Sequence, residues 1–477
     1  MGAPRRGRLA RASWAWGLLL AQALGAAAQE VQEPALEPQL EQARSAIGLQ
    51  PDDGVWETSG RWSGPIGSGA FAWVFSADGH FLLDLRGLER RRYAFDGQTL
   101  RRNDGSGGSW RVGGAEAERI QLLAHVWSGA WARPASPCTR SSSEVEGELI
   151  LGLHSGRAAA RLTLDDEGRR PTRLLLQESL GGIHHAMTGS AAWYSPPGSG
   201  TQERPTLWMP GRVVSTHEDG REVVYEVADA RPWAGGEVPF ERLPASPSLL
   251  QLDPGVGSTL ELNLSDEGAW SVAGRLRGRR LSLELIPRCT GLELGRELVA
   301  ELLPGASPVA GRVGFREPLR VGPLVRSYPT AALVDLSDGS AGSDGRIGWE
   351  LLAAGVLQLS TTEPQLSLRG PVPGDGRHAW APVLFDDQRP VLVATGKTGA
   401  PRLLALIRPG GQSRHFLGPE PLTLEVAGRP LRLAGGADSG EDLPYDGVVA
   451  LDALGPDVLI DALGRGLARP APRSEQD

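Results

Sequence analysis

The feature that most constrains the fold is a recurrent alternation of apolar and polar residues, interrupted by Asp-Gly turns. The run FAWVFSADGHFLLDLRG (71–87) is followed by RRYAFDGQTLRRND (91–104), which has the same rhythm. Period-two alternation bounded by Asp-Gly is typical of antiparallel β-hairpins. Glycine (64) and proline (37) make up about a fifth of the 477 residues, which disfavours long helical bundles. The sequence therefore predicts a mainly β protein.

Further hairpins continue this pattern, with turns predicted at 165–168 and 218–220. One helix is expected, over GGAEAERIQLLAHVWSGAWA (113–132), because its apolar residues recur at helical spacing. These residues are Ile120, Leu123, Val126 and Trp127. We therefore expect curved antiparallel sheet with one helix in the first block, residues 48–243.

The N-terminus has the pattern of a signal peptide. A segment with four arginines precedes the apolar run 14–24, and small residues follow at 25–28. Cleavage after Ala28 would leave an exported protein, periplasmic or secreted, without a transmembrane segment; an uncleaved anchor is the alternative. Residues 29–47 are predicted as a linker or a frayed helix. The formal net charge of −8 provides no basic surface, which disfavours nucleic-acid binding.

Nine of the 14 tryptophans fall between Val55 and Trp233, and we expect them to line the concave face of a curved sheet. The segments YAFDG (93–97) and DGREVVY (219–225), with the hairpin rhythm, give residues 48–240 a resemblance to the LolA-like lipoprotein-carrier fold. That resemblance implies a sheet that holds a lipid tail. The alternative is that the tryptophans form an ordinary core.

A second part of the chain contains an internal duplication. Residues 278–289 align without gaps with residues 399–410, each as a turn glycine, a strand and a proline-arginine pair. Further along, 344–352 (DGRIGWELL) matches 446–454 (DGVVALDAL). Residues 244–254 are rich in proline and serine and are predicted to connect this part to the first block.

The repeated order resembles the retropepsin-like aspartic proteases, over residues 255–370 and 375–470, followed by a tail at 471–477. The resemblance implies two β-barrel lobes. In the family, the second repeated block carries a glycine, which is Gly348 in the first copy and Ala450 in the second.

The catalytic Asp-Thr-Gly of that family is absent from both copies. Its positions are occupied by Ile286, Pro287 and Arg288 and by Ile407, Arg408 and Pro409. Aspartic proteolysis needs two carboxylates that share a proton, and isoleucine neither titrates nor orients water. We therefore predict a non-catalytic protein that binds a peptide, a lipid or a partner protein in the cell envelope. The alternatives are a lipid carrier acting through the first block, and an active peptidase that uses displaced carboxylates at Asp335 and Asp338. The simpler interpretation is that those two aspartates lie in an ordinary turn.

Other motifs fail on their spacing. Adjacent His184 and His185 would point to opposite faces of a strand, and His217-Glu218 lacks the second histidine of a zinc-protease motif. Residues 396–398 (GKT) lack the first glycine of a P-loop, and no G-x-S-x-G nucleophile motif occurs where a strand meets a helix. No metal or cofactor is expected. Cys138 and Cys289 are predicted as two buried thiols or one disulfide.

Overall fold

The computed structural model is mainly β, which confirms the predicted fold class. The structure describes residues 36–47, 54–64, 67–103, 109–143, 145, 148–154, 159–165, 170–177, 187–190, 192–194, 209–216, 222–233, 240, 250–253, 255, 258–264, 270–286, 291–309, 311–336, 342–348, 356–360, 365–369, 379–386, 389–396, 399, 401–407, 412–436, 445–455, 457–461 and 466–469.

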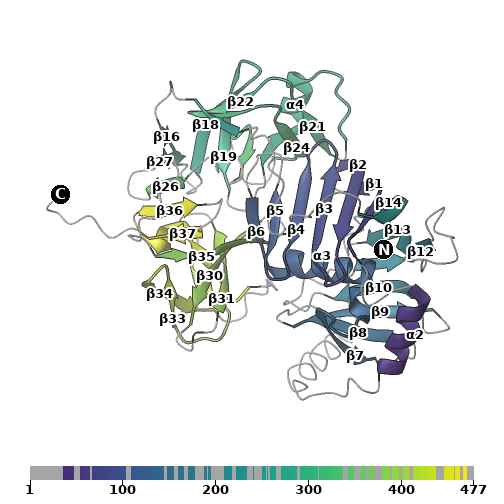
Figure 1. Ribbon diagram of the computed structural model, residues 1–477. Coiled ribbons are helices and arrows are strands. Elements are labelled where there is room, and N and C mark those ends of the chain that lie inside the picture. The colour runs from purple at the N-terminus through teal and green to yellow at the C-terminus, as the bar shows by residue number, and fades with distance from the viewer. Residues whose placement is uncertain are drawn as a thin grey trace, which may run out of the picture.

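The first block is built on a curved antiparallel sheet in the order β12-β13-β14-β1-β2-β3-β4-β5-β6. Its strands are β1 (Trp56–Gly64), β2 (Gly67–Phe75), β3 (Phe81–Arg86), β4 (Arg91–Phe95), β5 (Leu100–Asn103), β6 (Ser109–Val112), β12 (Ala192–Tyr194), β13 (Met209–Thr216) and β14 (Glu222–Pro232). Figure 1 shows β1 to β5 side by side, with α3 at their lower ends. The hairpins predicted at the first Asp-Gly turns are β2–β3 and β4–β5.

The predicted helix over 113–132 is found as α3 (Gly114–Trp127) and the 3-10 turn η2 (Ala130–Ala132). Below it lies a smaller antiparallel sheet in the order β11-β10-β9-β8-β7. Its strands are β7 (Cys138–Ser142), β8 (Glu148–Leu153), β9 (Ala159–Leu164), β10 (Pro171–Gln177) and β11 (Met187–Ser190). Strands β9 and β10 pair on either side of the turn predicted at 165–168, and β13 and β14 pair on either side of the one predicted at 218–220. Apart from Asp165, the residues of these two predicted turns lie outside the described residues.

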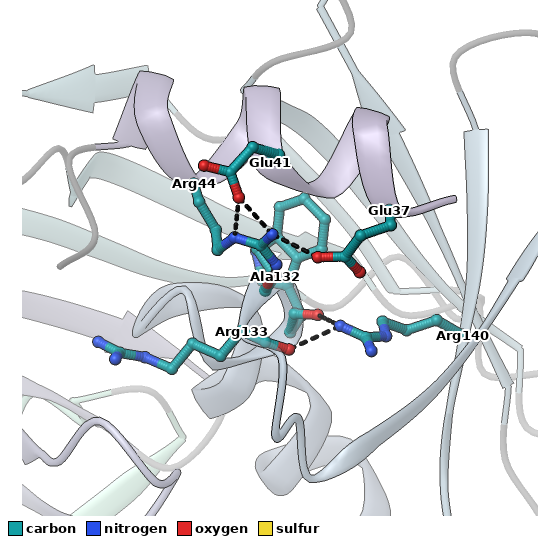
Figure 2. Close-up of polar contacts among 7 residues, drawn as sticks. Glu37, Glu41, Arg44, Ala132, Arg133 and Arg140 are labelled. Carbon is teal, nitrogen blue, oxygen red and sulfur yellow. Dashed lines mark hydrogen bonds and ion pairs between the residues drawn. The ribbon is translucent and has the colours of Figure 1, made fainter. Parts of the chain in front are cut away.

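The segment predicted as a linker or a frayed helix contains an ordered helix, α2 (Glu37–Ile47). Its apolar side, with Leu40 and Ile47, is buried in the same core as the first sheet. On its polar side, Arg44 pairs with the acidic residues of its own helix and donates a 2.9 Å hydrogen bond to the carbonyl of Ala132 (Figure 2). Burial of the apolar side therefore explains why this short acidic segment folds.

The second half of the chain has two copies of one strand order. The first copy comprises β15 (Leu250–Leu252), β16 (Thr259–Glu261), β17 (Asn263–Leu264), β18 (Trp270–Leu276), β19 (Arg279–Leu285), β20 (Leu292–Gly295), α4 (Arg296–Leu302), β21 (Arg312–Gly314), β22 (Leu319–Val321), β23 (Leu324–Arg326), β24 (Thr330–Val334), β25 (Gly345–Ile347), β26 (Val356–Ser360) and β27 (Gln365–Arg369). Within it, β25 lies between β19 and β20, parallel to the first and antiparallel to the second.

The second copy repeats this arrangement. It comprises β28 (Trp380–Ala381), β29 (Val383–Asp386), β30 (Arg389–Thr395), β31 (Pro401–Ile407), β32 (Arg414–His415), β33 (Leu422–Val426), β34 (Arg429–Gly435), β35 (Gly447–Ala450), η3 (Leu451–Leu454), β36 (Asp457–Asp461) and β37 (Gly466–Ala468). Here β35 lies between β31 and β32, again parallel to the first and antiparallel to the second. The register also repeats, because Leu283 pairs with Gly345 and Leu404, its aligned counterpart, pairs with Gly447.

The two copies meet in a six-stranded sheet with the order β16-β27-β26-β36-β37-β28. Each copy supplies three strands, and the central pair β26–β36 is antiparallel. Leucines and valines from both copies form one continuous core that reaches from Leu260 to Leu467. The duplicated half is therefore a single folded unit with two similar lobes.

The first block contacts both copies. On one side β6 pairs in parallel with β29, where the Trp110 and Phe385 rings lie 4.7 Å apart between centroids. This pairing makes the first sheet continuous with that of the second copy, as Figure 1 shows. On the other side, Arg312 of the first copy donates a 2.6 Å hydrogen bond to Glu89 in the β3–β4 turn.

Candidate functional site

The concave face of the first sheet carries a dense group of buried aromatic side chains, which we call the aromatic cluster. It comprises Trp62, Phe71, Trp73, Phe75, Phe81, Tyr93, Phe95, Trp127, Trp131 and Tyr225. Period-two alternation places every second residue of β2, β3 and β4 on this face, and α3 and η2 contribute the two tryptophans that cover it. The expectation that tryptophans line the concave face thus holds for these residues.

The rings of the aromatic cluster contact one another in sequence. The Trp73 and Trp127 ring centroids lie 4.8 Å apart, and Phe71 meets Trp127 edge-on at 6.1 Å. Tyr225 of β14 reaches both Phe71 and Trp127, at 5.4 and 5.8 Å. Edge-on and tilted pairs of this kind are favourable aromatic arrangements. The cluster therefore joins the sheet to the helix that covers it.

This apolar interior also contains buried polar atoms that the described residues leave without hydrogen-bond partners. They are Thr58 Oγ1, Trp73 Nε1, His125 Nδ1 and Nε2, Trp127 Nε1, Trp131 Nε1 and Ser215 Oγ. Thr58 lies opposite Trp73 on β1, and Ser215 lies on the same face of β13 as Val213, so both hydroxyls point to the cluster. Buried polar groups in folded proteins nearly always have a partner, and each exception calls for an explanation.

His125 is the most unusual of these groups. It lies in the last turn of α3, is 1% exposed, and its ring packs against Phe95 at 6.3 Å between centroids. Burial, with a smaller contribution from nearby His80, lowers the pKa of His125 to about 3. The imidazole is therefore neutral at physiological pH, with one ring nitrogen able to donate a hydrogen bond and the other able to accept one.

At the start of α3, by contrast, the buried polar side chains are hydrogen-bonded to one another. Glu116 accepts hydrogen bonds from the Tyr93 hydroxyl at 3.0 Å and from Arg102 at 3.2 Å. Burial and the neighbouring Glu116 carboxylate raise the pKa of Tyr93 to about 12. This network ties β4 and β5 to the helix, so the first turn of α3 is fixed by paired charges while its last turn is not.

The positions that correspond to the lost catalytic motif lie at the ends of equivalent strands. Ile286 follows β19, and its backbone N–H donates to the Ile347 carbonyl at 3.1 Å. Ile407 ends β31 and pairs with Ala450 of β35. The remaining motif positions, Pro287, Arg288, Arg408 and Pro409, lie outside the described residues.

Of the two substitute aspartates, the structure describes only Asp335. Asp335 follows β24 with an exposed side chain, and its carboxylate accepts a hydrogen bond from Arg296 of α4 at 3.0 Å. Asp338 lies outside the described residues. Asp335 is thus seen in a surface ion pair, an arrangement with little energetic weight of its own.

The first aspartate of each repeated Asp-Gly block has a structural role. Asp344 accepts a hydrogen bond from the backbone N–H of Ser282 at 2.8 Å, and Asp446 accepts one from Leu403 at the same distance. Ser282 and Leu403 are aligned positions of the two copies. Each aspartate therefore anchors the start of its Asp-Gly block to the preceding hairpin. The sequence pattern alone did not indicate this role.

Most of the remaining sequence candidates lie outside the described residues. Cys138 has a free buried thiol, whose pKa burial raises to about 12, and Cys289 lies outside the described residues. His184, His185 and His217 also lie outside them. Among the described residues, no group of three His, Cys, Asp or Glu side chains is arranged to hold a metal ion. In the same part of the chain, no helix has the length and apolar character to cross a membrane.

Sequence reasoning missed Thr58, Ser215 and His125 as a group. The one available signal was a histidine within the apolar helical run AHVW, next to Val126 and Trp127. Thr58 and Ser215 lie on strands about 160 residues apart in the chain, and nothing local indicates that both face the same interior.

Comparisons with known proteins give weak similarities. No family model and no curated protein matches the chain. A crystal structure of a LolA superfamily protein from Nitrosomonas europaea is 12% identical and covers 43% of this chain and 95% of its own, with a TM-score of 0.26. A DUF1329 family protein from Desulfovibrio piger is 9% identical, with coverages of 42% and 95% and a TM-score of 0.27. MucB is 11% identical, with coverages of 66% and 98% and a TM-score of 0.13.

The first of these neighbours is named for the same superfamily as the LolA-like resemblance noted from the sequence. Similarities of this size assign neither a family nor a function.

Proposed function

We propose that the protein is a non-catalytic binding protein of the cell envelope, and that its first block holds an acyl-type ligand against the aromatic cluster. The observation that carries the proposal is the set of polar atoms that have no hydrogen-bond partner among the described residues and lie beside the aromatic cluster. An interior completed by protein alone would leave these donors uncompensated, at a cost of about 1–3 kcal/mol each.

The chemistry of these atoms restricts the ligand. An indole N–H only donates, so Trp73, Trp127 and Trp131 need acceptor oxygens from the ligand or its water. The surrounding rings favour an apolar body. A fatty acyl chain with a carboxyl, ester or amide oxygen has both properties, whereas a plain hydrocarbon has only the second.

Export, to the periplasm or out of the cell, is supported by the N-terminal pattern of arginines, an apolar run and small residues. A carrier or receptor for acylated molecules needs a sheltered apolar interior, because the free energy of exposing an acyl chain to water rises by about 0.8 kcal/mol per CH₂. Export and acyl binding are therefore parts of one proposal, and each can be tested alone.

Native mass spectrometry of the protein purified from its own host tests the proposal, followed by titration of the delipidated protein with palmitate. We expect bound acyl species in the first measurement and saturable tryptophan quenching in the second. Clean ligand-free protein that also fails to bind palmitate would overturn acyl binding.

A matched pair of variants locates the site. Trp127→Phe keeps an aromatic ring and removes one N–H donor, so palmitate affinity should fall about three- to tenfold. Trp270→Phe makes the same change at a buried tryptophan of the duplicated half and should leave affinity unchanged. Equal effects of the two substitutions would move the site away from the aromatic cluster.

A second candidate function is peptide binding without cleavage by the duplicated half. The repeated strand order and the six-stranded sheet between the copies support it, together with the retropepsin-like resemblance and isoleucine at both catalytic positions, Ile286 and Ile407. A peptide library should bind and remain intact at acid pH. Cleavage that pepstatin inhibits would instead establish an active peptidase.

A further inference from the structure

The first copy of the duplicated half buries an arginine that has no partner among the described residues. Arg326 ends β23 and is 9% exposed. Its Nε is buried, and no acceptor in the described part of the chain forms a hydrogen bond or ion pair with its guanidinium group. The other buried arginines of the described chain each contact an acid or a backbone carbonyl; they are Arg91, Arg92, Arg102, Arg140 and Arg312.

Strand pairing places the Arg326 side chain on the core-facing side of the β22–β23 hairpin. Arg326 pairs with Leu319 of β22 and lies two residues after Leu324, so the three residues share one face. Both leucines belong to the core of the duplicated half. An arginine keeps its positive charge inside a protein, and a buried charge without a counter-ion is strongly unfavourable. Arginine at this position therefore makes the fold less stable.

The hairpin has a counterpart in the second copy, β33–β34, and the sequence aligns the two. Each hairpin reads Glu-Pro-Leu before its turn and Pro-Leu after it, at residues 317–319 and 323–324 and at residues 420–422 and 430–431. Two residues after the second match, the first copy has Arg326 and the second copy has Leu433. The alignment therefore assigns leucine to the equivalent position.

The strand register supports this alignment independently. Leu422 pairs with Leu433 across the hairpin of the second copy. The same cross-strand position in the first copy is occupied by Leu319 and Arg326. Leu433 is fully buried in the shared core, so the fold accepts an aliphatic side chain here. Because replacing a buried ion with an apolar residue is often neutral or stabilising, the arginine indicates a role other than folding.

The first copy also differs from the second two residues further along. Tyr328 is 65% exposed and has a φ of 49°, in the left-handed region that a tyrosine adopts only under strain. Its aligned counterpart is Gly435. Strained residues cluster at functional sites, and arginine and tyrosine are enriched among the residues that dominate binding. Both side chains follow from the same end of β23, which marks this end as a binding position.

We propose that Arg326 binds the carboxylate of a peptide held by the duplicated half, which rests on the peptide-binding candidate function above. A carboxylate has two oxygens that match two parallel N–H groups of a guanidinium. Its single negative charge neutralises one arginine, whereas a doubly charged phosphate would leave excess charge in a largely buried place. The carboxylate belongs either to an acidic side chain or to the C-terminus of the peptide.

Equilibrium dialysis of the full-length protein against heptapeptide pools at pH 7 tests the site. All peptides are acetylated at the N-terminus, and their random positions lack aspartate and glutamate. One pool has a fixed glutamate and an amidated C-terminus, a second has glutamine instead, and a third has glutamine and a free C-terminal carboxylate. We expect the first or the third pool to bind at least about tenfold more tightly than the second. Preference for the first identifies an acidic side chain, and preference for the third identifies the C-terminus.

Two substitutions in the same hairpin locate the effect. Arg326→Leu introduces the residue of the second copy, so it should abolish the preference and leave the melting temperature unchanged or higher. Arg320→Leu is the matched control, because Arg320 lies on the opposite face of the hairpin, with a side chain that is 51% exposed and 3.2 Å from Asp253. The control should keep the preference.

The possible failures are distinguishable. Equal binding of the three pools, or equal loss in Arg326→Leu and Arg320→Leu, would overturn the role of Arg326 and leave peptide binding intact. No binding of any pool would overturn both. A lower melting temperature of Arg326→Leu would show a structural role for the arginine and overturn the proposal. Palmitate affinity should be unchanged in Arg326→Leu, and its loss would assign the guanidinium group to the acyl ligand instead.

Discussion

The first block and the duplicated half bury their interiors with different chemistry. The core of the first block contains ten aromatic side chains, whereas the main core of the duplicated half, which is of similar size, contains only Trp270 and Phe315 among its described buried members. Aliphatic side chains of similar volume exchange easily between two copies of one fold. The aromatic interior of the first block is assembled from strands distant in sequence and has no second copy to match. Its side chains can therefore become specific for one ligand.

Two buried histidines show the same contrast. His415 of the second copy is 2% exposed; its Nδ1 accepts from the Leu417 N–H at 3.2 Å and its Nε2 lies 2.7 Å from the Glu420 carbonyl. Since Nδ1 accepts, Nε2 bears the proton and donates it. His125 of the first block is equally buried, and neither ring nitrogen has a partner among the residues that the structure describes. A buried histidine whose ring nitrogens are both hydrogen-bonded stabilises the fold. A buried histidine whose ring nitrogens lack partners is a candidate for contact with a ligand.

The strongest test of equivalence between the copies uses their aligned core leucines. Leu283 and Leu404 are both fully buried and pair with the equivalent residues Gly345 and Gly447. Each Leu→Ala substitution should lower the free energy of unfolding by about 2–5 kcal/mol. The two losses, measured by guanidinium unfolding, should agree within about 1 kcal/mol, since the two leucines occupy equivalent, fully buried positions. A difference of several kcal/mol would break the equivalence.

A smaller effect is expected at the paired aspartates, where the copies should differ. The Asp446 side chain is 8% exposed and that of Asp344 is 30% exposed, although each accepts a backbone N–H at 2.8 Å. Asp446→Ala should cost about 3 kcal/mol and Asp344→Ala about 1 kcal/mol, because water can replace the lost acceptor only at the exposed site. Thermal unfolding measures both values, and the reverse order would show that burial does not set the cost.

The strands and their pairings were largely predictable from sequence because their signals are local. The hairpins, the helix over 113–132 and the alignment of residues 278 and 399 all depend on turn residues and periodicity. The ordered helix α2 was not clearly predicted, because its stability depends on burial against distant strands. The candidate site was harder for the same reason, since Thr58, His125 and Ser215 face one interior only through the curvature and register of the sheet.

The last prediction concerns pH and the unpartnered His125. Its pKa of about 3 in the folded protein lies below the ordinary value of 6.5, so above pH 6.5 the ring is neutral in both the folded and unfolded states. As the pH falls from 6.5 towards 3, the unfolded chain takes up a proton that the folded protein does not. Folding stability should therefore drop by about 2 kcal/mol between pH 7 and pH 5 through this residue alone.

His125→Leu should remove that share of the pH dependence, measured as the difference in unfolding free energy between pH 7 and pH 5. Leu404→Ala is the control, since it destabilises the protein without altering a titratable group and should keep the full drop. Measuring the same drop with ligand bound tests whether His125 of the first block, unlike the histidine of the duplicated half, contacts a ligand. If an acceptor oxygen of the ligand binds His125, the ring gains a partner for its proton, and the drop should become smaller when palmitate is present. An unchanged drop would show that His125 does not contact the ligand. The indole N–H groups would then remain as the polar contacts of the acyl site.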